Sequence, residues 1–275
     1  MNLRSILSLA GLLLVPLALT SCVTNAFAPS AHIKGTPQPD RWKLFLQKAE
    51  QGEIEEVPDE PQDSQPLGLV TVRRDRAATP ARTRTRSEDF AGHFRPEAKT
   101  SYARGWKRRA TDIESLLNRM ASDAEMTQKD PELVRLKNHE SHEPRISLEK
   151  RNLTVDAWLY WEGHQSDNDY HLILGNTSEL TDQTVFMNAE ISALPRGQPN
   201  AQPFTALRAQ FRQLIAAHPN KRGAFVKPVP VRITGSLLWD GEHRNPHNVG
   251  PKKPLDLRPK KAWEIHPIHD LQAAP

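Results

Sequence analysis

From residue 152 onward, the apolar positions recur mostly in the pattern of β-strands. Runs rich in β-branched and aromatic residues, bounded by polar or turn residues, predict strands over 152–163, 170–176, 184–192, 229–240 and 262–268. One segment differs: over residues 204–218 the apolar positions share a single helix face, and Pro219 ends that helix. The predicted order is therefore three strands, one helix and two strands.

This order is the chain order of the OB-fold, a five-stranded and partly open Greek-key barrel. The predicted strands are short and alternating, and no βα unit repeats, which argues against a parallel α/β sheet. We therefore predict a mainly β fold with helices, in which an OB-like five-stranded barrel spans residues 144–275.

Residues 99–143 have a helical pattern instead. Apolar residues at spacings of three and four predict one helix over 103–124, namely Trp106, Ala110, Ile113, Leu117, Met120 and Ala124. Asp130 and Pro131 then predict the start of a short helix that ends near Lys137. We expect this helical segment to pack against the barrel.

The N-terminus has the anatomy of an export signal. Arg4 supplies a positive charge, and an apolar stretch from Ile6 to Leu19 follows, too short for a comfortable transmembrane helix. We predict a signal peptide over residues 1–21. Cys22 is the only cysteine of the 275 residues, so the chain forms no internal disulfide.

The stretch Leu19-Thr20-Ser21-Cys22 resembles the bacterial lipobox. That resemblance implies cleavage before Cys22 and acylation of its thiol and new amino group. It also implies anchoring in the lipid membrane of the cell envelope, because two or three acyl chains suffice for stable attachment. The residue after the cysteine is Val23 and not an aspartate. In a host with two membranes, this favours the outer one. An ordinary secretory signal with an incidental cysteine is the alternative.

Residues 22–98 show almost no periodicity, and prolines are scattered through them. An acidic stretch over 50–63 is followed by a basic stretch over 73–86. We predict a mostly disordered tether here, with a short helix over 40–50. The arginines of the basic stretch could contact anionic lipid or polyanions, and a solvated linker is the simpler interpretation. The net charge of +4 does not demand a nucleic-acid partner.

Strand alternation assigns a polar set to the outer face of the predicted barrel. In an OB barrel the second strand neighbours the third and the third neighbours the fifth, so these residues would converge on one outer patch. The candidate patch consists of Asp167, Asp169, His171, Glu190, Asp240, His243, Glu264 and His266. Crowded like charges cost free energy unless a cation, a proton or hydrogen bonds offset them. Pairing of the carboxylates with histidines and with Lys260 or Lys261 is the structural alternative.

The segment DNDYHLILGN, with FMNAEIS, VRITGSLLWDGEH and AWEIHPI after it, resembles a domain of many uncharacterised exported bacterial proteins. The resemblance covers residues 150–270 and implies a fold and export, but no activity. The same region is distantly similar to thermonuclease-like OB-folds, in which Asp167, Asp169 and Glu190 would match calcium ligands. This chain lacks their Gly and Thr at the strand start, and Arg232 and Lys261 are poor substitutes for their arginines.

Three functional hypotheses follow. In the first, the anchored domain binds an envelope or anionic ligand. Trp158 and Tyr160 would stack on that ligand. Alternatively, these two side chains pack beneath the 103–124 helix. Basic residues of the loop before the last predicted strand would attract an anionic ligand: Lys252, Lys253, Arg258, Lys260 and Lys261.

In the second hypothesis the chain is a divalent-metal-dependent hydrolase of phosphodiesters, with Asp169, His171, Glu190, Glu264 and His266 as metal ligands or general base. The two histidines favour zinc or manganese over calcium or magnesium. His139 and His142 form a second histidine pair, better interpreted as part of a solvated loop. The third hypothesis is a purely structural envelope lipoprotein.

Overall fold

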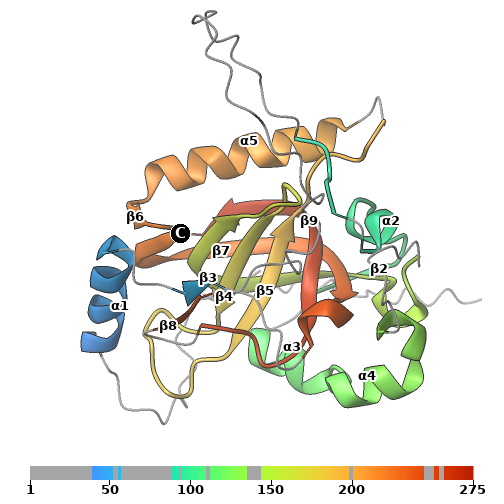
Figure 1. Ribbon diagram of the computed structural model, residues 1–275, viewed down its shortest axis with the longest axis horizontal. Helices are drawn as coiled ribbons and strands as arrows, with labels where there is room; N and C mark the ends of the chain where they lie inside the picture. Colours follow the sequence, from blue (N-terminus) through green and yellow to red (C-terminus); the bar gives the residue numbers. More distant parts are fainter. Residues whose placement is uncertain are drawn as a thin grey trace, which may run out of the picture.

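The computed structural model of the protein describes residues 39–51, 55–56, 88–92, 94–109, 112–134, 144–197, 201–244, 251–253 and 257–274. Seven strands form one mixed sheet, and β3 pairs with β7 in addition, so that β3, β4, β5, β9 and β7 close into a ring (Figure 1). The strands of the sheet, in spatial order, are β2 (Trp106–Arg109), β3 (Arg151–His164), β4 (Tyr170–Gly175), β5 (Phe186–Ile191), β9 (Trp263–Ala273), β7 (Ala224–Trp239) and β6 (Asn220–Lys221). A separate two-stranded sheet joins β1 (Glu55–Glu56) to β8 (Pro251–Lys253).

The mainly β architecture and the order of three strands, a helix and two strands are as predicted, apart from the short additions β6 and β8. Strands β3, β4 and β5 lie close to their predicted ranges, whereas β7 begins earlier and β9 ends later than expected. Helix α5 (Gln202–Ala217) also forms where expected, and it buries Leu207, Phe211 and Leu214 against the strands. Phe204 of the same helix is buried in a stack with Tyr102. Figure 1 shows α5 on one side of the strands and two short helices on the other.

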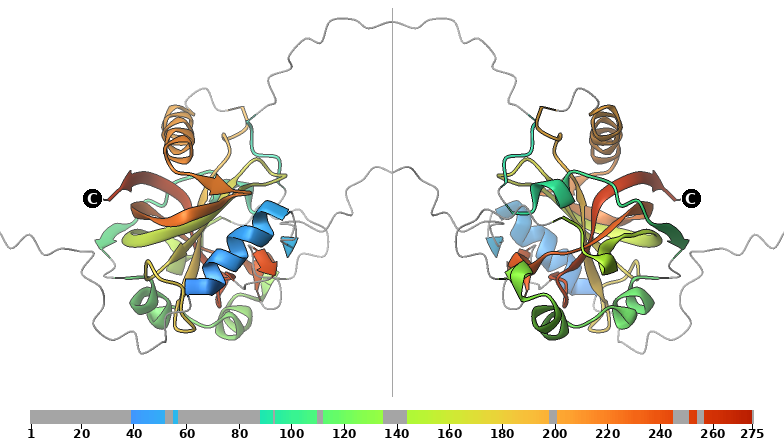
Figure 2. Two further views of the ribbon diagram at one scale, coloured as in Figure 1. Left: turned by 90° about the vertical axis from the view of Figure 1, so that its left-hand side faces the viewer. Right: turned by 90° about the vertical axis from the view of Figure 1, so that its right-hand side faces the viewer.

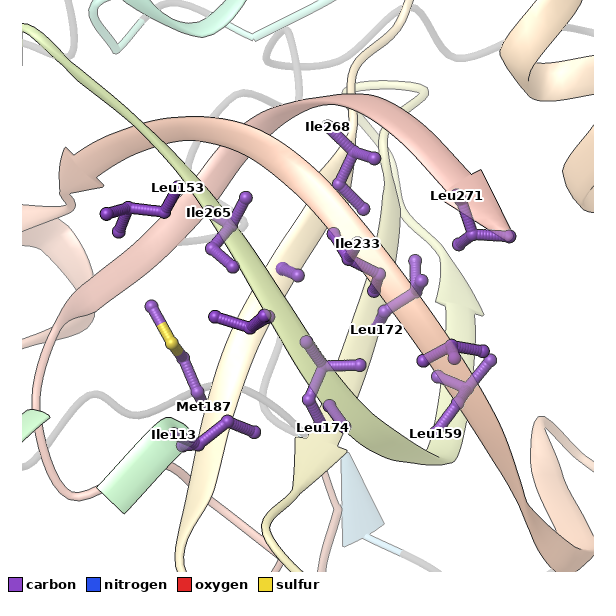
Figure 3. Packing of buried hydrophobic residues seen from close by; sticks show 14 of the residues in the cluster. Ile113, Leu153, Leu159, Leu172, Leu174, Met187, Ile233, Ile265, Ile268 and Leu271 are labelled. Atoms are coloured by element: carbon purple, nitrogen blue, oxygen red, sulfur yellow. The ribbon is translucent and has the colours of Figure 1, made fainter. Parts of the chain in front are cut away.

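The hydrophobic core fills the inside of the ring, as alternation predicts. Leu159 of β3, Leu172 of β4, Met187 of β5, Ile233 of β7 and Ile265 of β9 are fully buried there (Figure 3). Alternation along 152–163 also predicts that Trp161 shares the inner face with Leu159, and this prediction is wrong. The β3 register shifts between Leu159 and Trp161, so that Trp161 turns out of the ring into a second apolar cluster.

The helix predicted over 103–124 is also wrong, because local capping overrides the apolar spacing. Residues 106–109 form β2, parallel to β3, and two helices follow: α3 (Ile113–Arg119) and α4 (Asp123–Lys129). The Asp112 side chain accepts a hydrogen bond from the Ser115 amide and starts α3. Ser122 and Glu125 form a capping box that starts α4. Three short 3-10 helices, η2 (Pro131–Val134), η3 (Ser147–Glu149) and η4 (Gly241–His243), complete the described elements.

Helix α1 (Pro39–Gln51) confirms the short helix expected in the tether, but its packing was not expected. Phe45 and Ala49 are fully buried in the second apolar cluster, with Tyr160 and Trp161 of β3. Trp42 stacks on Phe45 and meets Tyr160 edge-on. Figure 2 shows α1 lying against the strands. Tyr160 therefore packs beneath α1, and not beneath a 103–124 helix or on an exposed stacking surface.

Truncation of this contact tests the docking of α1. We expect Phe45→Ala to lower the free energy of unfolding by about 3–5 kcal/mol, because removal of the buried ring leaves a cavity between α1 and β3 that neither element can fill. The adjacent Leu44 is 47% exposed, so Leu44→Ala is a matched control that should change stability by less than about 0.5 kcal/mol. Equal denaturant midpoints for the two variants would show that α1 does not pack as described.

Several sequence predictions fall outside the described residues: the signal peptide over 1–21, Cys22, the basic stretch over 73–86, and His139 with His142. Among the described helices, none has the length and apolarity to cross a membrane.

Candidate functional site

Three neighbouring strands bring the predicted polar residues together on the face opposite the core. His171 of β4 lies opposite Glu190 of β5, and Asn188 of β5 lies opposite Glu264 of β9. Asp169 precedes β4, and His266 follows Glu264 by two positions on β9. Because alternate residues point to the same side of a strand, all six side chains extend from one side of the sheet.

Glu190 lies at the centre of this cluster. One carboxylate oxygen, Oε1, is 3.1 Å from Nε2 of His171 and accepts a hydrogen bond of 2.5 Å from the Asn188 amide. The other, Oε2, is 2.8 Å from Nδ1 of His266. His266 Nδ1 is also 3.0 Å from Oε1 of Glu264, so one imidazole nitrogen lies between two carboxylates.

The end of β7 adds a third group of residues. Asp240 Oδ2 lies 3.3 Å from Nδ1 of His243 and 2.9 Å from the ammonium of Lys99. The His243 ring is 6.1 Å from the His171 ring, centroid to centroid. Asp167 accepts a hydrogen bond from the backbone amide of Asp169 and holds the start of β4. All eight residues of the predicted patch are therefore brought into one region.

The expectation of an exposed outer patch is wrong, because every one of these residues is buried. Glu190, Asp169, Asp240 and His266 are 0% exposed. The cover comes from residues 88–92 and 94–103, here called the covering segment, most of which the sequence had assigned to the tether. Its backbone bonds to Asp167 and Leu194, and Figure 2 shows its short helix α2 (Pro96–Lys99) beside the strands. Within the described part of the chain, the cluster therefore presents no open face to a large ligand.

The covering segment also supplies the charges that the sequence did not reveal. Lys99 pairs with Asp240, a role that was expected from the sequence for Lys260 or Lys261. Lys261 instead donates hydrogen bonds to the carbonyls of Leu117 and Met120. Arg95 forms two hydrogen bonds with Glu149, of 2.8 and 2.6 Å. Asn188 was missed as well, although its position two residues before Glu190 on the same strand face was a usable signal.

The buried charges shift one another's protonation. Burial opposes the charged form of Lys99, but Asp240, Glu190 and Glu264 together raise its pKa well above the ordinary value. Burial likewise opposes ionisation of Glu190, yet His171 and His266 hold its pKa well below the usual range. Burial and the charge of Glu190 raise the pKa of Glu264 to about 7. The carboxylates around His266 outweigh its burial and raise its pKa well above that of a free histidine.

These shifts predict the pH dependence of the metal-free protein. Glu264 and His266 have raised pKa values in the folded state, so the folded state binds more protons than the unfolded state as pH rises above 4.5. Stability should therefore fall with pH, by roughly 3 kcal/mol from Glu264 alone between its unfolded pKa and pH 8. Urea unfolding at pH 5, 6, 7 and 8 measures this slope. In Glu264→Gln the slope should shrink, and an unchanged slope would contradict the assignment.

Two buried atoms of the cluster face each other as an ion pair, at a separation that also suits two ligands of one metal ion. His266 Nε2 and Asp169 Oδ2 are 3.4 Å apart, and neither has a hydrogen-bond partner among the described residues. Bonds of about 2.0–2.2 Å at the tetrahedral angle hold two ligands of one zinc ion about 3.4 Å apart. Asp169, Glu190 and His266 each offer a ligand atom within 4.8 Å of the others.

Comparison of the chain with family models, with curated proteins and with solved structures gave no match. The interpretation of the cluster therefore depends on its own geometry and chemistry.

Proposed function

We propose that this chain is a lipid-anchored protein of the bacterial cell envelope whose β domain binds a divalent cation between Asp169, Glu190 and His266. The observation that carries the proposal is the pair His266 Nε2 and Asp169 Oδ2, two fully buried atoms that face each other at 3.4 Å, an ion-pair distance, with no hydrogen bond to any other described group. A cation between them would satisfy both atoms, and it would offset the surplus of carboxylates around them.

The ligand types favour zinc or manganese. Imidazole nitrogen with carboxylate oxygen suits these ions, whereas calcium and magnesium prefer oxygen ligands alone. A hydrolytic cation keeps one coordination position open to water and substrate. Here the three ligands are fully buried beneath the covering segment, so holding the fold together is a better supported role than hydrolysis of a phosphodiester.

Isothermal titration with Zn²⁺ tests the proposal. The chain with Cys22→Ser is suitable, because it lacks both the acylation site and the only thiol. Submicromolar binding is expected, weakened at least 100-fold by Asp169→Asn, since the amide supplies no charge. Asp270→Asn, a half-buried position on the same strand β9, is the control and should bind as the parent does. Equal affinity in the two variants, or no binding in the parent, would refute a site at this position.

The membrane anchor is a separate part of the proposal. It is supported by the charged start, the short apolar stretch and the lipobox-like Leu19-Thr20-Ser21-Cys22. In cells supplied with labelled palmitate, the wild-type chain should incorporate label and fractionate with membranes. Cys22→Ser should lose the label and leave the membrane fraction. A Cys22→Ser chain that stays membrane-bound to the same extent would argue for another mode of attachment.

We also propose that the ring of β3, β4, β5, β9 and β7 is an OB-like barrel. Three features support this assignment: the chain order, the antiparallel closure of β3 on β7, and the parallel pairing of β5 with β9. The resemblance of residues 150–270 to exported bacterial domains agrees with an envelope location.

A further inference from the structure

We infer that the buried cluster binds two divalent cations that share Glu190 as a common ligand. This inference rests on the proposed function, because it presupposes that the triad of Asp169, Glu190 and His266 binds the first cation. It adds a second site, formed by Glu190, His243 and Glu264.

The second site has its own set of ligand atoms. Glu190, His243 and Glu264 each offer one within 4.8 Å of the others, and Glu190 is the sole member that the two triads have in common. A carboxylate has two oxygens, and those of Glu190 already face different partners: Oε1 lies near His171, and Oε2 near His266. A bridging carboxylate is the usual device by which a protein holds two cations about 3.5–4 Å apart.

A small cavity beside the second triad points to a bound ion independently of the carboxylates. Its volume is about 10 Å³, and its lining includes Asn188, His243 and Glu264. That is room for about one water-sized particle. Asn188 is 3% exposed, and its carbonyl oxygen Oδ1 has no hydrogen-bond partner in the described part of the chain. An amide oxygen beside two carboxylates and an imidazole completes a mixed oxygen and nitrogen ligand set.

The charges of the cluster agree with two cations. Five buried carboxylates, Asp167, Asp169, Glu190, Asp240 and Glu264, outnumber the buried cations beside them, Lys99 and Arg145. With neutral histidines a surplus of three negative charges remains, and a single divalent cation offsets only two of them. Asp240, 3.3 Å from His243, would orient that imidazole as a carboxylate behind a metal-bound histidine does.

Counting bound ions tests the inference. Native mass spectrometry and equilibrium dialysis with Mn²⁺ are carried out on a parent chain that carries Cys22→Ser and His142→Ala. The second substitution removes adventitious binding by the pair His139 and His142. Two ions per chain are expected. His243→Ala and His266→Ala should each retain one, and Asp270→Asn should retain two. The paramagnetic resonance spectrum of the two-ion form should show coupling between Mn²⁺ centres, and the spectra of the one-ion variants should not.

The outcomes separate the inference from the proposed function. One ion in the parent, lost in His266→Ala and kept in His243→Ala, would leave the proposed function standing and overturn the second site. Two uncoupled ions, or two ions that persist in His243→Ala, would also overturn it, because the second ion would then lie elsewhere. Zero ions would refute both. Circular dichroism of each variant shows whether it is folded, and Asn188→Ala, which keeps every charged ligand, should weaken binding of the second ion alone.

Discussion

Lys99→Met is expected to destabilise the metal-free protein by about 3–5 kcal/mol and, at the same time, to tighten its binding of divalent cations. Lys99 is 4% exposed, and its ammonium lies 2.9 Å from Asp240. Methionine keeps most of the side-chain volume and removes the charge. Asp240 then loses the ammonium that pairs with it, and a buried carboxylate without a partner carries the full cost of desolvation.

The opposite signs of the two effects make this variant informative. A cation bound to Lys99→Met relieves more repulsion than one bound to the parent, so the stabilisation by saturating Zn²⁺ should be larger in the variant. Urea unfolding with and without Zn²⁺ measures both quantities. Lys260→Met, at an exposed position close to the same cluster in sequence, is the control and should change neither. Weaker binding of Zn²⁺ by Lys99→Met would show that Lys99 does not compete with the cation for the same carboxylates.

Arg95→Met is expected to cost a similar amount, about 3–5 kcal/mol, for a different reason. Arg95 is fully buried and holds Glu149 by two hydrogen bonds, and it also donates to the carbonyls of Trp239 and Pro144. It thereby joins the covering segment to η3 and to the end of β7. Without the guanidinium, Glu149 keeps its bonds from the Trp239 and Ile146 amides and the nearby charge of Arg145, but it loses the cation that pairs with it directly.

Limited proteolysis and urea unfolding test this prediction. Loss of the Arg95 contacts should expose the covering segment to protease well before the strands are cut. Arg212→Met is the matched control, because Arg212 also pairs with a carboxylate of the covering segment, Glu88, but on the surface. An exposed pair contributes at most about 1 kcal/mol. Similar costs for the two substitutions would mean that the Arg95 pair is not buried as described.

The strand pattern was enough to predict the convergence of the polar cluster. Period-two alternation places Asp169 with His171, and Glu264 with His266, on the faces opposite Leu172 and Ile265. The order of strands along the chain then brings those faces together. The helix over 103–124 failed because apolar spacing cannot distinguish one long helix from a strand and two short capped helices. The Ser122 and Glu125 capping signal was present and outweighed the spacing.

The covering segment could not be predicted in the same way. Its buried residues, such as Phe90, Phe94 and Arg95, stand among prolines and charges without a helical or strand period. Burial there comes from contacts with residues far along the chain, and a single sequence gives no measure of those. Lys99 in particular is indistinguishable in the sequence from a solvated lysine. Its partner Asp240 lies far away in the chain, and only the fold joins them.

Anomalous diffraction from crystals grown with Zn²⁺, recorded on both sides of the zinc absorption edge, locates the bound cation directly. We expect anomalous density between His266 Nε2, Asp169 Oδ2 and the Glu190 carboxylate, beneath an ordered covering segment. Well-ordered crystals in which His266 Nε2 bonds directly to Asp169, with the anomalous density elsewhere or absent, would contradict the proposed site.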